Sequence, residues 1–277
     1  MLGSELRLVF GRRRNQLLLL VVALFPLLIG IALKIAAPSG AAGGGNGNAN
    51  GPNNGSAFFN QLAGNGVFLT FIALTMLLIL VLPVVVSVVS GDSVAGEAGH
   101  GTLRYLLTVP AGRTRLLSVK YLAIVAFATT AVFIVAIVAL LAGVVMFPVG
   151  PVTLLSGTTV SLADGLLRVL GVTLYIAVAM AAVGAIGLAI STLTEHAIGA
   201  IAALMILVVG SEVADDVPQF AAAGPYLPTH WWPMFDSLLR SPVDTTTLWH
   251  GLASFVVYAV LFCLLAWARF TTADVTS

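Results

Sequence analysis

Long uncharged runs of apolar residues dominate the chain, and short stretches that carry charge, proline or glycine separate them. A helix needs about 20 mostly apolar residues to cross the hydrocarbon core of a bilayer. Six runs approach or exceed that length, so the pattern predicts an all-α membrane protein with six transmembrane helices. The expected spans cover residues 17–37, 67–90, 120–147, 167–193, 197–214 and 249–269.

Two of these runs carry signals for where their helices end. Residues 121–163 hold no charge and are too long for one span, so Pro148 and Pro151 are expected to end the third helix near residue 147. In the last run, Trp249 and Trp267 are 18 residues apart. That separation is about 27 Å along a helix, which would place both rings at the membrane interfaces.

Composition excludes a water-soluble globule. Hydrophobic residues make up 59% of the chain and charged residues only 8%, whereas ordinary soluble domains carry roughly 25% charged residues. The net charge of +1 provides no basic field for a nucleic acid. The single cysteine, Cys263, allows neither an intrachain disulfide nor a multi-cysteine metal site.

Lysine and arginine are divided unevenly between the segments that join the spans. If the N-terminus lies inside, nine of the 12 fall on inner segments, so the positive-inside rule predicts that both termini are cytoplasmic. The first apolar run follows an arginine triplet but is longer than the core of a signal peptide. A retained span is therefore expected rather than a cleaved signal.

Two segments outside the spans have a distinctive composition. Residues 1–16 are expected to form a short amphipathic helix in the inner interface, the alternative being a solvated basic tail. The apolar residues that recur there at helical spacing are Leu2, Leu6, Val9 and Phe10. Residues 38–66 are rich in glycine and asparagine and are expected to form a flexible outer loop.

Residues 91–119, between the second and third spans, form a longer link than two neighbouring helices require. Leu103, Leu106 and Leu107 share one face of a short predicted helix, and Pro110 ends it. An amphipathic helix at a membrane surface binds lipid or a partner. The mixed charges of this segment favour a protein partner.

The order of residues in this link resembles that of the permease subunits of ABC-2 type ABC transporters. The matching positions are Asp92, Glu97, Gly101, Thr102, Leu103, Leu106, Leu107, Pro110 and Arg113, followed by Lys120. The resemblance implies that residues 91–119 carry a coupling helix that inserts into an ATP-binding subunit. It also implies that residues 1–277 form one ABC-2 type transmembrane domain, which works with a second permease chain and two ATP-binding chains.

Residues 215–248, between the fifth and sixth spans, are rich in proline and aromatic residues. Proline prevents one continuous helix, and aromatic rings favour a membrane interface. The family resemblance implies short re-entrant helices at this place. Trp231, Trp232 and Phe235 are candidates for an outer gate, the alternative being ordinary anchoring at the interface.

The sequence offers no catalytic motif. A phosphate-binding Walker loop needs Gly-Lys-Ser/Thr, and neither Lys34 nor Lys120 follows a glycine. The four histidines lack the spacing of a zinc-protease motif, so no metal or cofactor is expected in this chain. The resemblance places ATP and magnesium on the separate ATP-binding subunit.

The expected function is therefore that of a permease subunit in the plasma membrane of a bacterium. It would export a hydrophobic or amphipathic solute (a drug, lipid or peptide), driven by the ATP-binding partner. Charge inside the spans is nearly absent, which argues against a transporter driven by protons or sodium. A stand-alone secondary transporter or channel remains an alternative, as does an assembly subunit that transports nothing.

Overall fold

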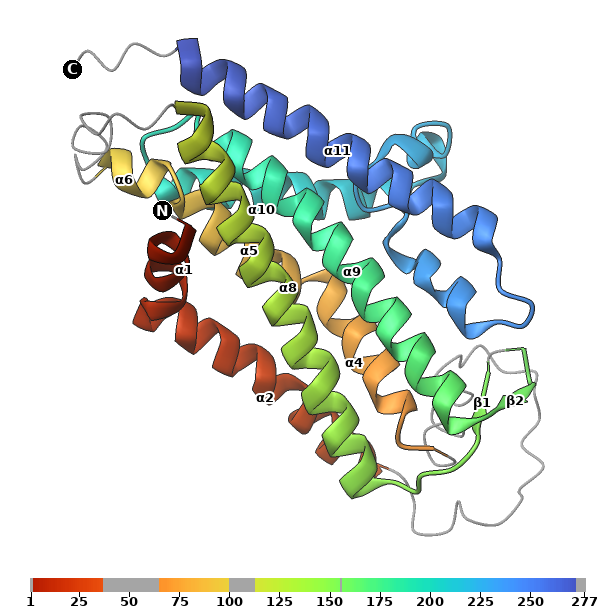
Figure 1. Cartoon of the computed structure of the whole chain (residues 1–277). Coiled ribbons are helices and arrows are strands. Elements are labelled where there is room, and N and C mark those ends of the chain that lie inside the picture. Colours follow the sequence, from red (N-terminus) through yellow and green to blue (C-terminus); the bar gives the residue numbers. More distant parts are fainter. Residues whose placement is uncertain (1, 37–64, 100–112, 155, 273–277) are drawn as a thin grey trace.

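The computed structural model describes residues 2–36, 65–99, 113–154 and 156–272 as a bundle of long helices (Figure 1). Within these residues five helices are long and apolar enough to cross a membrane, or six if one bent pair counts as a span. They are α2 (Arg13–Ala36), α8 (Arg113–Met146), α9 (Leu162–Ser191), α10 (Ala197–Asp215), α11 (Thr245–Thr272) and the pair α4 (Phe68–Ile79) and α5 (Val81–Asp92). This architecture agrees with the predicted all-α membrane protein.

The bundle is organised around α9, the most buried of the single-helix candidate spans. Helices α5, α8, α10 and α11 all pack on it. Small residues make this close approach possible: a Cβ at Gly187 would overlap the hydroxyl of Ser90 and lie 2.7 Å from a methyl group of Leu204. The alanines and glycines of α9 thus face its neighbours, as their number in the sequence suggests.

The second expected span is broken in the middle. Helices α4 and α5 meet at an angle of 51°, and Leu80 between them has φ −134° and ψ −52°. Pro83 explains the break, because its ring would clash with the carbonyl of residue 79 in a continuous helix. In the first turn of α5, by contrast, its missing N–H leaves no helical hydrogen bond unmade.

The long helices extend beyond the apolar runs that predict them. Helix α8 begins at Arg113 rather than at residue 120, and α9 begins at Leu162 rather than at residue 167. The hydroxyl of Ser161 caps α9 by accepting from the N–H of Asp164. Hydropathy marks the part of a helix that lies in hydrocarbon, whereas the cap decides where the helix begins.

The two ends of the bundle differ in structure (Figure 1). One, called here the α1 end, carries α1 (Leu2–Gly11), α6 (Ala95–Gly99) and the last turns of α11. The other, the hairpin end, carries a two-stranded hairpin that the sequence did not predict. Its strands are β1 (Val152–Thr153) and β2 (Thr159–Val160), antiparallel with Val152 opposite Val160.

The proline-rich segment between α10 and α11 also lies at the hairpin end. As expected from its prolines it forms no long helix, and instead makes three short 3-10 helices. They are η1 (Pro218–Phe220), η2 (Gly224–Tyr226) and η3 (Trp232–Leu239). Helix η3 packs on α9 and α11.

Candidate functional site

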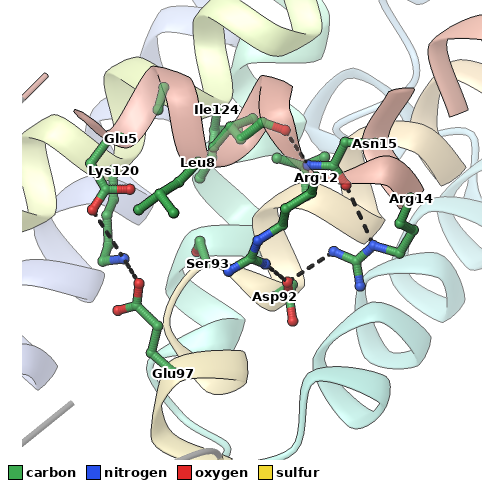
Figure 2. A pocket seen from close by; sticks show the side chains of 13 residues that line it. Glu5, Leu8, Arg12, Arg14, Asn15, Asp92, Ser93, Glu97, Lys120 and Ile124 are labelled. Atoms are coloured by element: carbon green, nitrogen blue, oxygen red, sulfur yellow. Dashed lines mark hydrogen bonds and ion pairs between the residues drawn. The ribbon is translucent and has the colours of Figure 1, made fainter. Parts of the chain in front are cut away.

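Charged side chains from five helices surround a small cavity at the α1 end (Figure 2). The polar residues of this ionic cluster are Glu5, Arg12, Arg14, Asn15, Asp92, Ser93, Glu97 and Lys120. The cavity has a volume of about 30 Å³, which holds water but no solute. Charges buried in an apolar bundle are tolerated only when they are paired. The way in which these side chains pair therefore decides whether the site can bind a charged ligand.

Asp92, the last residue of α5, accepts hydrogen bonds from two arginines: Arg12 in the turn before α2 and Arg14 in the first turn of α2. Nη2 of Arg14 lies 2.8 Å from its Oδ2, and Nη1 of Arg12 donates to the same oxygen. The Asp92 side chain is 12% exposed and each arginine 46%. Figure 2 shows both guanidinium groups converging on this carboxylate from the turn between α1 and α2.

Asn15 fixes that turn. The residue is 2% exposed, and its Nδ2 donates to the carbonyl of Val9 over 2.8 Å. The main-chain N–H of Asn15 also donates to the carbonyl of Arg12. The sharp change of direction between α1 and α2 is thereby held by the same residues that reach Asp92.

Lys120 joins three helices through one ammonium group. It lies two turns into α8 with a side chain only 4% exposed, and its Nζ is 2.6 Å from Oε1 of Glu97 on α6. Oε1 of Glu5 on α1 lies 3.7 Å from the same nitrogen. Figure 2 shows Lys120 between the two glutamates.

The cluster is balanced in charge, with three cations (Arg12, Arg14 and Lys120) facing three carboxylates (Glu5, Asp92 and Glu97). A balanced set around a water-sized cavity does not select a charged solute. It instead ties α1, α2, the end of α5, α6 and α8 into one unit. Removing one partner of a buried ion pair typically lowers stability by about 3–5 kcal/mol. Separating these helices from one another is therefore unfavourable.

Helix α1 also packs through its apolar face. Val9 and Phe10 lie against the core of the bundle, and the ring centroids of Phe10 and Phe127 on α8 are 5.5 Å apart. Leu8 lines the cavity of the ionic cluster and is 52% exposed. A short helix is thus present at the predicted place and docks on α8. It ends at Gly11 rather than at residue 16, because the chain turns there into α2, and its location in the membrane interface stays a prediction.

At the hairpin end, polar contacts organise the segment between α10 and α11. Nδ1 of His230 lies 2.7 Å from Oδ1 of Asp215, and the hydroxyls of Ser211 and Thr229 are 2.7 Å apart. The Tyr175 hydroxyl donates to a main-chain carbonyl of the same segment. Among the described residues, no group of three or more His, Cys, Asp or Glu could hold a metal ion.

A protein-family comparison identifies the group of proteins to which the chain is related. The model of a family described as "Protein of unknown function (DUF2705)" matches residues 47–276. The chain belongs to the DUF2705 family. No curated protein matches the sequence.

In this DUF2705 chain only some of the predicted coupling residues lie in the part that the structure describes. Asp92 and Glu97 are brought together at the ionic cluster. Arg113 is the first residue of α8. Lying outside the described residues are Gly101, Thr102, Leu103, Leu106, Leu107 and Pro110, together with most of the expected flexible loop at 38–66. That these positions face an ATP-binding subunit stays a prediction.

The candidate gate residues of the DUF2705 chain separate into two kinds. Trp232 and Phe235 are buried in the core, with exposed fractions of 2% and 4%. Trp231 is half-buried, and its ring stacks on His250 with centroids 5.8 Å apart. Its Nε1 donates to the carbonyl of Pro225. These contacts fix the aromatic residues in place, and a gating role stays a prediction.

Sequence reasoning did not anticipate the partners that complete the cluster. The arginine triplet is fully explained by the positive-inside rule, and Lys120 by its place at the start of an apolar run. The available signal is the position of Asp92, directly after an apolar run, since a carboxylate entering the membrane requires a counter-charge. Nothing in the sequence spacing states which cation supplies it.

Proposed function

We propose that this chain is the permease subunit of an ATP-driven transporter of the ABC-2 kind. ATP would be hydrolysed by a separate subunit, and the chain would export a hydrophobic or amphipathic solute such as a drug, lipid or peptide. Three features support the proposal: the set of apolar helices, the short helix α1 ahead of them, and a sequence that lacks the glycine-lysine pair of a Walker loop.

The ionic cluster is the observation that carries the proposal. Residues 100–112, which hold most of the expected coupling residues, connect α6 to α8. Glu97 precedes this segment and Lys120 follows it, and the two bond to one another. A force applied to the segment would therefore reach α6 and α8 together, and through Asp92 and its arginines also α2 and α5.

This arrangement would let a movement of residues 100–112 be transmitted to the helices of the bundle. In the proposed mechanism, ATP binding closes the dimer of ATP-binding subunits, and the segment moves with α6 and the start of α8. The spans then change from an inward-open to an outward-open arrangement. The balanced charge of the cluster lets it move as a body without exposing an unpaired charge to lipid.

The distribution of basic residues supports an orientation for this mechanism. The α1 end carries Arg7, the triplet at residues 12–14, Arg115, Lys120 and Arg269, whereas Arg168 and Arg240 lie at the hairpin end. The positive-inside rule then puts the α1 end in the cytoplasm, where ATP is available. We propose the plasma membrane of a bacterium and a second permease chain as the setting.

The first experiment is purification of the tagged full-length chain from its own host in mild detergent, with mass spectrometry of what accompanies it. The expected result is a stoichiometric partner that bears a Walker loop. A chain that purifies alone, and that moves solute in liposomes with an ion gradient, would establish the secondary transporter or channel instead. A partner whose ATPase activity responds to no solute would point to an assembly subunit.

A substitution separates coupling from folding. Leu103→Asp places a charge on the predicted coupling face and should abolish co-purification of the ATP-binding subunit while leaving the permease in the membrane. Glu97→Arg is less clean, because it also removes the contact with Lys120. Thr159→Asp is the matched control, since it adds the same charge at an exposed position of the hairpin end and should keep the partner.

A further inference from the structure

A groove of about 520 Å³ lies between α8 and α11 near the α1 end. Both helices pack extensively on α9, but they share few contacts with each other. The space between them is therefore open, with α9 as its floor at Leu188. Its walls are apolar and include Leu117 and Leu122 of α8 and Val260 and Leu264 of α11.

The groove opens on the outer surface of the bundle, where its apolar residues are exposed. Leu122, Val260 and Leu264 are 51%, 54% and 59% exposed, and all three lie in candidate spans. The groove extends along two helices that run through the hydrocarbon. Its shape and its chemistry match a flexible hydrocarbon chain better than a compact polar solute.

One end of the groove is polar. The indole Nε1 of Trp267 donates to Oγ1 of Thr114 over 3.0 Å, which joins α11 to the first turn of α8. The hydroxyl of Ser118 lies one turn further along, also on the lining. Tryptophan rings favour the boundary between hydrocarbon and headgroups, so this end of the groove lies at the level of the phosphates.

A cation stands beside the polar end. Arg115 follows Thr114 directly and is exposed, and no ion-pair partner of it lies within the described part of the chain. On a helix, residues three and four apart share a face, so Arg115 borders the side that carries Ser118. An exposed arginine at this level is complementary to a phosphate group.

We propose that the groove binds an anionic phospholipid, with one acyl chain between α8 and α11 and the phosphate at Arg115 and Ser118. The site is separate from the ionic cluster and does not depend on an ATP-binding partner. It requires only that α8, α9 and α11 lie in a bilayer. The bound lipid fills a space that the helices themselves leave open beside the first turns of α8.

Cys263 provides a direct probe, because it lines the groove and is the single cysteine of the chain. The full-length protein in detergent is treated with a maleimide while phosphatidylglycerol or phosphatidylcholine is added. Phosphatidylglycerol should protect the thiol at a concentration about fivefold lower than phosphatidylcholine, the factor that one arginine at an anionic surface supplies. Arg115→Gln should remove that difference and leave the protection by high concentrations of either lipid.

Variants on α11 test the place of binding. Ala259→Trp fills the groove and should abolish the effect of lipid on Cys263. Val257→Trp is the matched control, because Val257 is 61% exposed on the same helix and is not among the residues that line the groove; it should behave as the parent chain. If Ala259→Trp fails to fold, a phosphatidylglycerol with a diazirine in its acyl chain is photolysed on the parent chain, and the adducts should concentrate on the groove lining.

Three results would overturn the proposal. The first is labelling of Cys263 that responds to neither lipid, or equally to both. The second is photo-adducts spread evenly over every exposed apolar helix face. The third is a cross-link between the Cys263 residues of two chains by a short bis-maleimide, which would show a second copy of the chain over the groove.

Discussion

Replacing Lys120 by methionine tests the ionic cluster most sharply. Methionine keeps the apolar stem and approximate length of lysine, so the substitution removes the charge and little else. In the parent chain the Nζ atom is 2.6 Å from Oε1 of Glu97, and the two side chains are 4% and 15% exposed. The variant therefore removes the ammonium group that Glu97 and Glu5 share, in a site that water scarcely reaches.

Protonation of the carboxylate limits how much stability the substitution can remove. Breaking a buried pair costs about 3–5 kcal/mol. A carboxylate that has lost its partner can instead take up a proton, which costs about 3.7 kcal/mol at pH 7 from the reference pKa of glutamate. At pH 5 the same protonation costs about 1 kcal/mol. We therefore expect Lys120→Met to lower the free energy of unfolding by roughly 3 kcal/mol at pH 7 and by much less at pH 5.

The direction of the pH dependence follows from the linkage between proton binding and folding. A glutamate that is protonated more readily in the folded variant than in the unfolded chain stabilises the fold at low pH, and this stabilisation disappears as the pH rises. The double variant Lys120→Met, Glu97→Gln has no carboxylate at position 97 to protonate. It should recover part of the lost stability at pH 7, because replacing both members of the Lys120–Glu97 pair by neutral groups is nearly neutral, whereas Glu5 still lacks the ammonium group.

The assay is unfolding by SDS in mixed micelles, followed by tryptophan fluorescence at both pH values. Arg240→Gln is the control: its pair with Asp236 is exposed, with side chains 60% and 38% accessible, and such pairs contribute about 0–1 kcal/mol. A loss below about 1 kcal/mol for Lys120→Met at pH 7 would refute the reasoning, since that is the size of a surface pair. So would a loss that does not change with pH, or a double variant that is no more stable than the single one.

Three further predictions concern other parts of the bundle. Gly187→Val should destabilise the chain severely in the same assay, because its side chain would overlap helix α5, whereas Gly210→Val, with open space around its Cβ position, should be tolerated. Asp92→Asn should weaken the bonds from both arginines and lower stability more than either arginine-to-glutamine change alone. The hydrogen bond from the Thr247 side chain lowers the pKa of Asp244, so its contribution to capping α11 is present at neutral pH and lost on acidification; Asp244→Asn and the parent should therefore differ in unfolding midpoint at pH 7 and converge in acid.

The long helices could be predicted from the sequence because burial in hydrocarbon requires long apolar runs, and such runs need no knowledge of neighbours. The predicted positions of the helix ends were less accurate. Arg113 starts α8 well before the apolar run, because polar residues that favour a helix extend it into the interface. The break at Leu80 lies inside a run that is uniformly apolar, and Pro83 was the local signal for it.

The ionic cluster could be predicted only in part. Asp92 and Glu97 attract notice as charges that follow an apolar run, but the partners of Asp92 come from the turn before α2 and from its first turn, 80 and 78 positions earlier in the chain. Sequence spacing carries no information on such pairs, because the packing of α1 and α2 against α5 decides them. The groove between α8 and α11 escapes prediction for the same reason: it depends on how both helices lie on α9.

The composition of the ionic cluster also imposes an order on biogenesis. Glu5, Arg12 and Arg14 leave the ribosome first, Asp92 and Glu97 follow after α5, and Lys120 arrives only with α8. Until α8 has been synthesised, the carboxylates of Glu5 and Glu97 lack the ammonium group that neutralises them. The ion pairs that join α1 and α6 to α8 therefore cannot form until more than a third of the chain has been translated. Completion of the cluster with Lys120 is thus the step that joins α1 and α6 to α8 through charge.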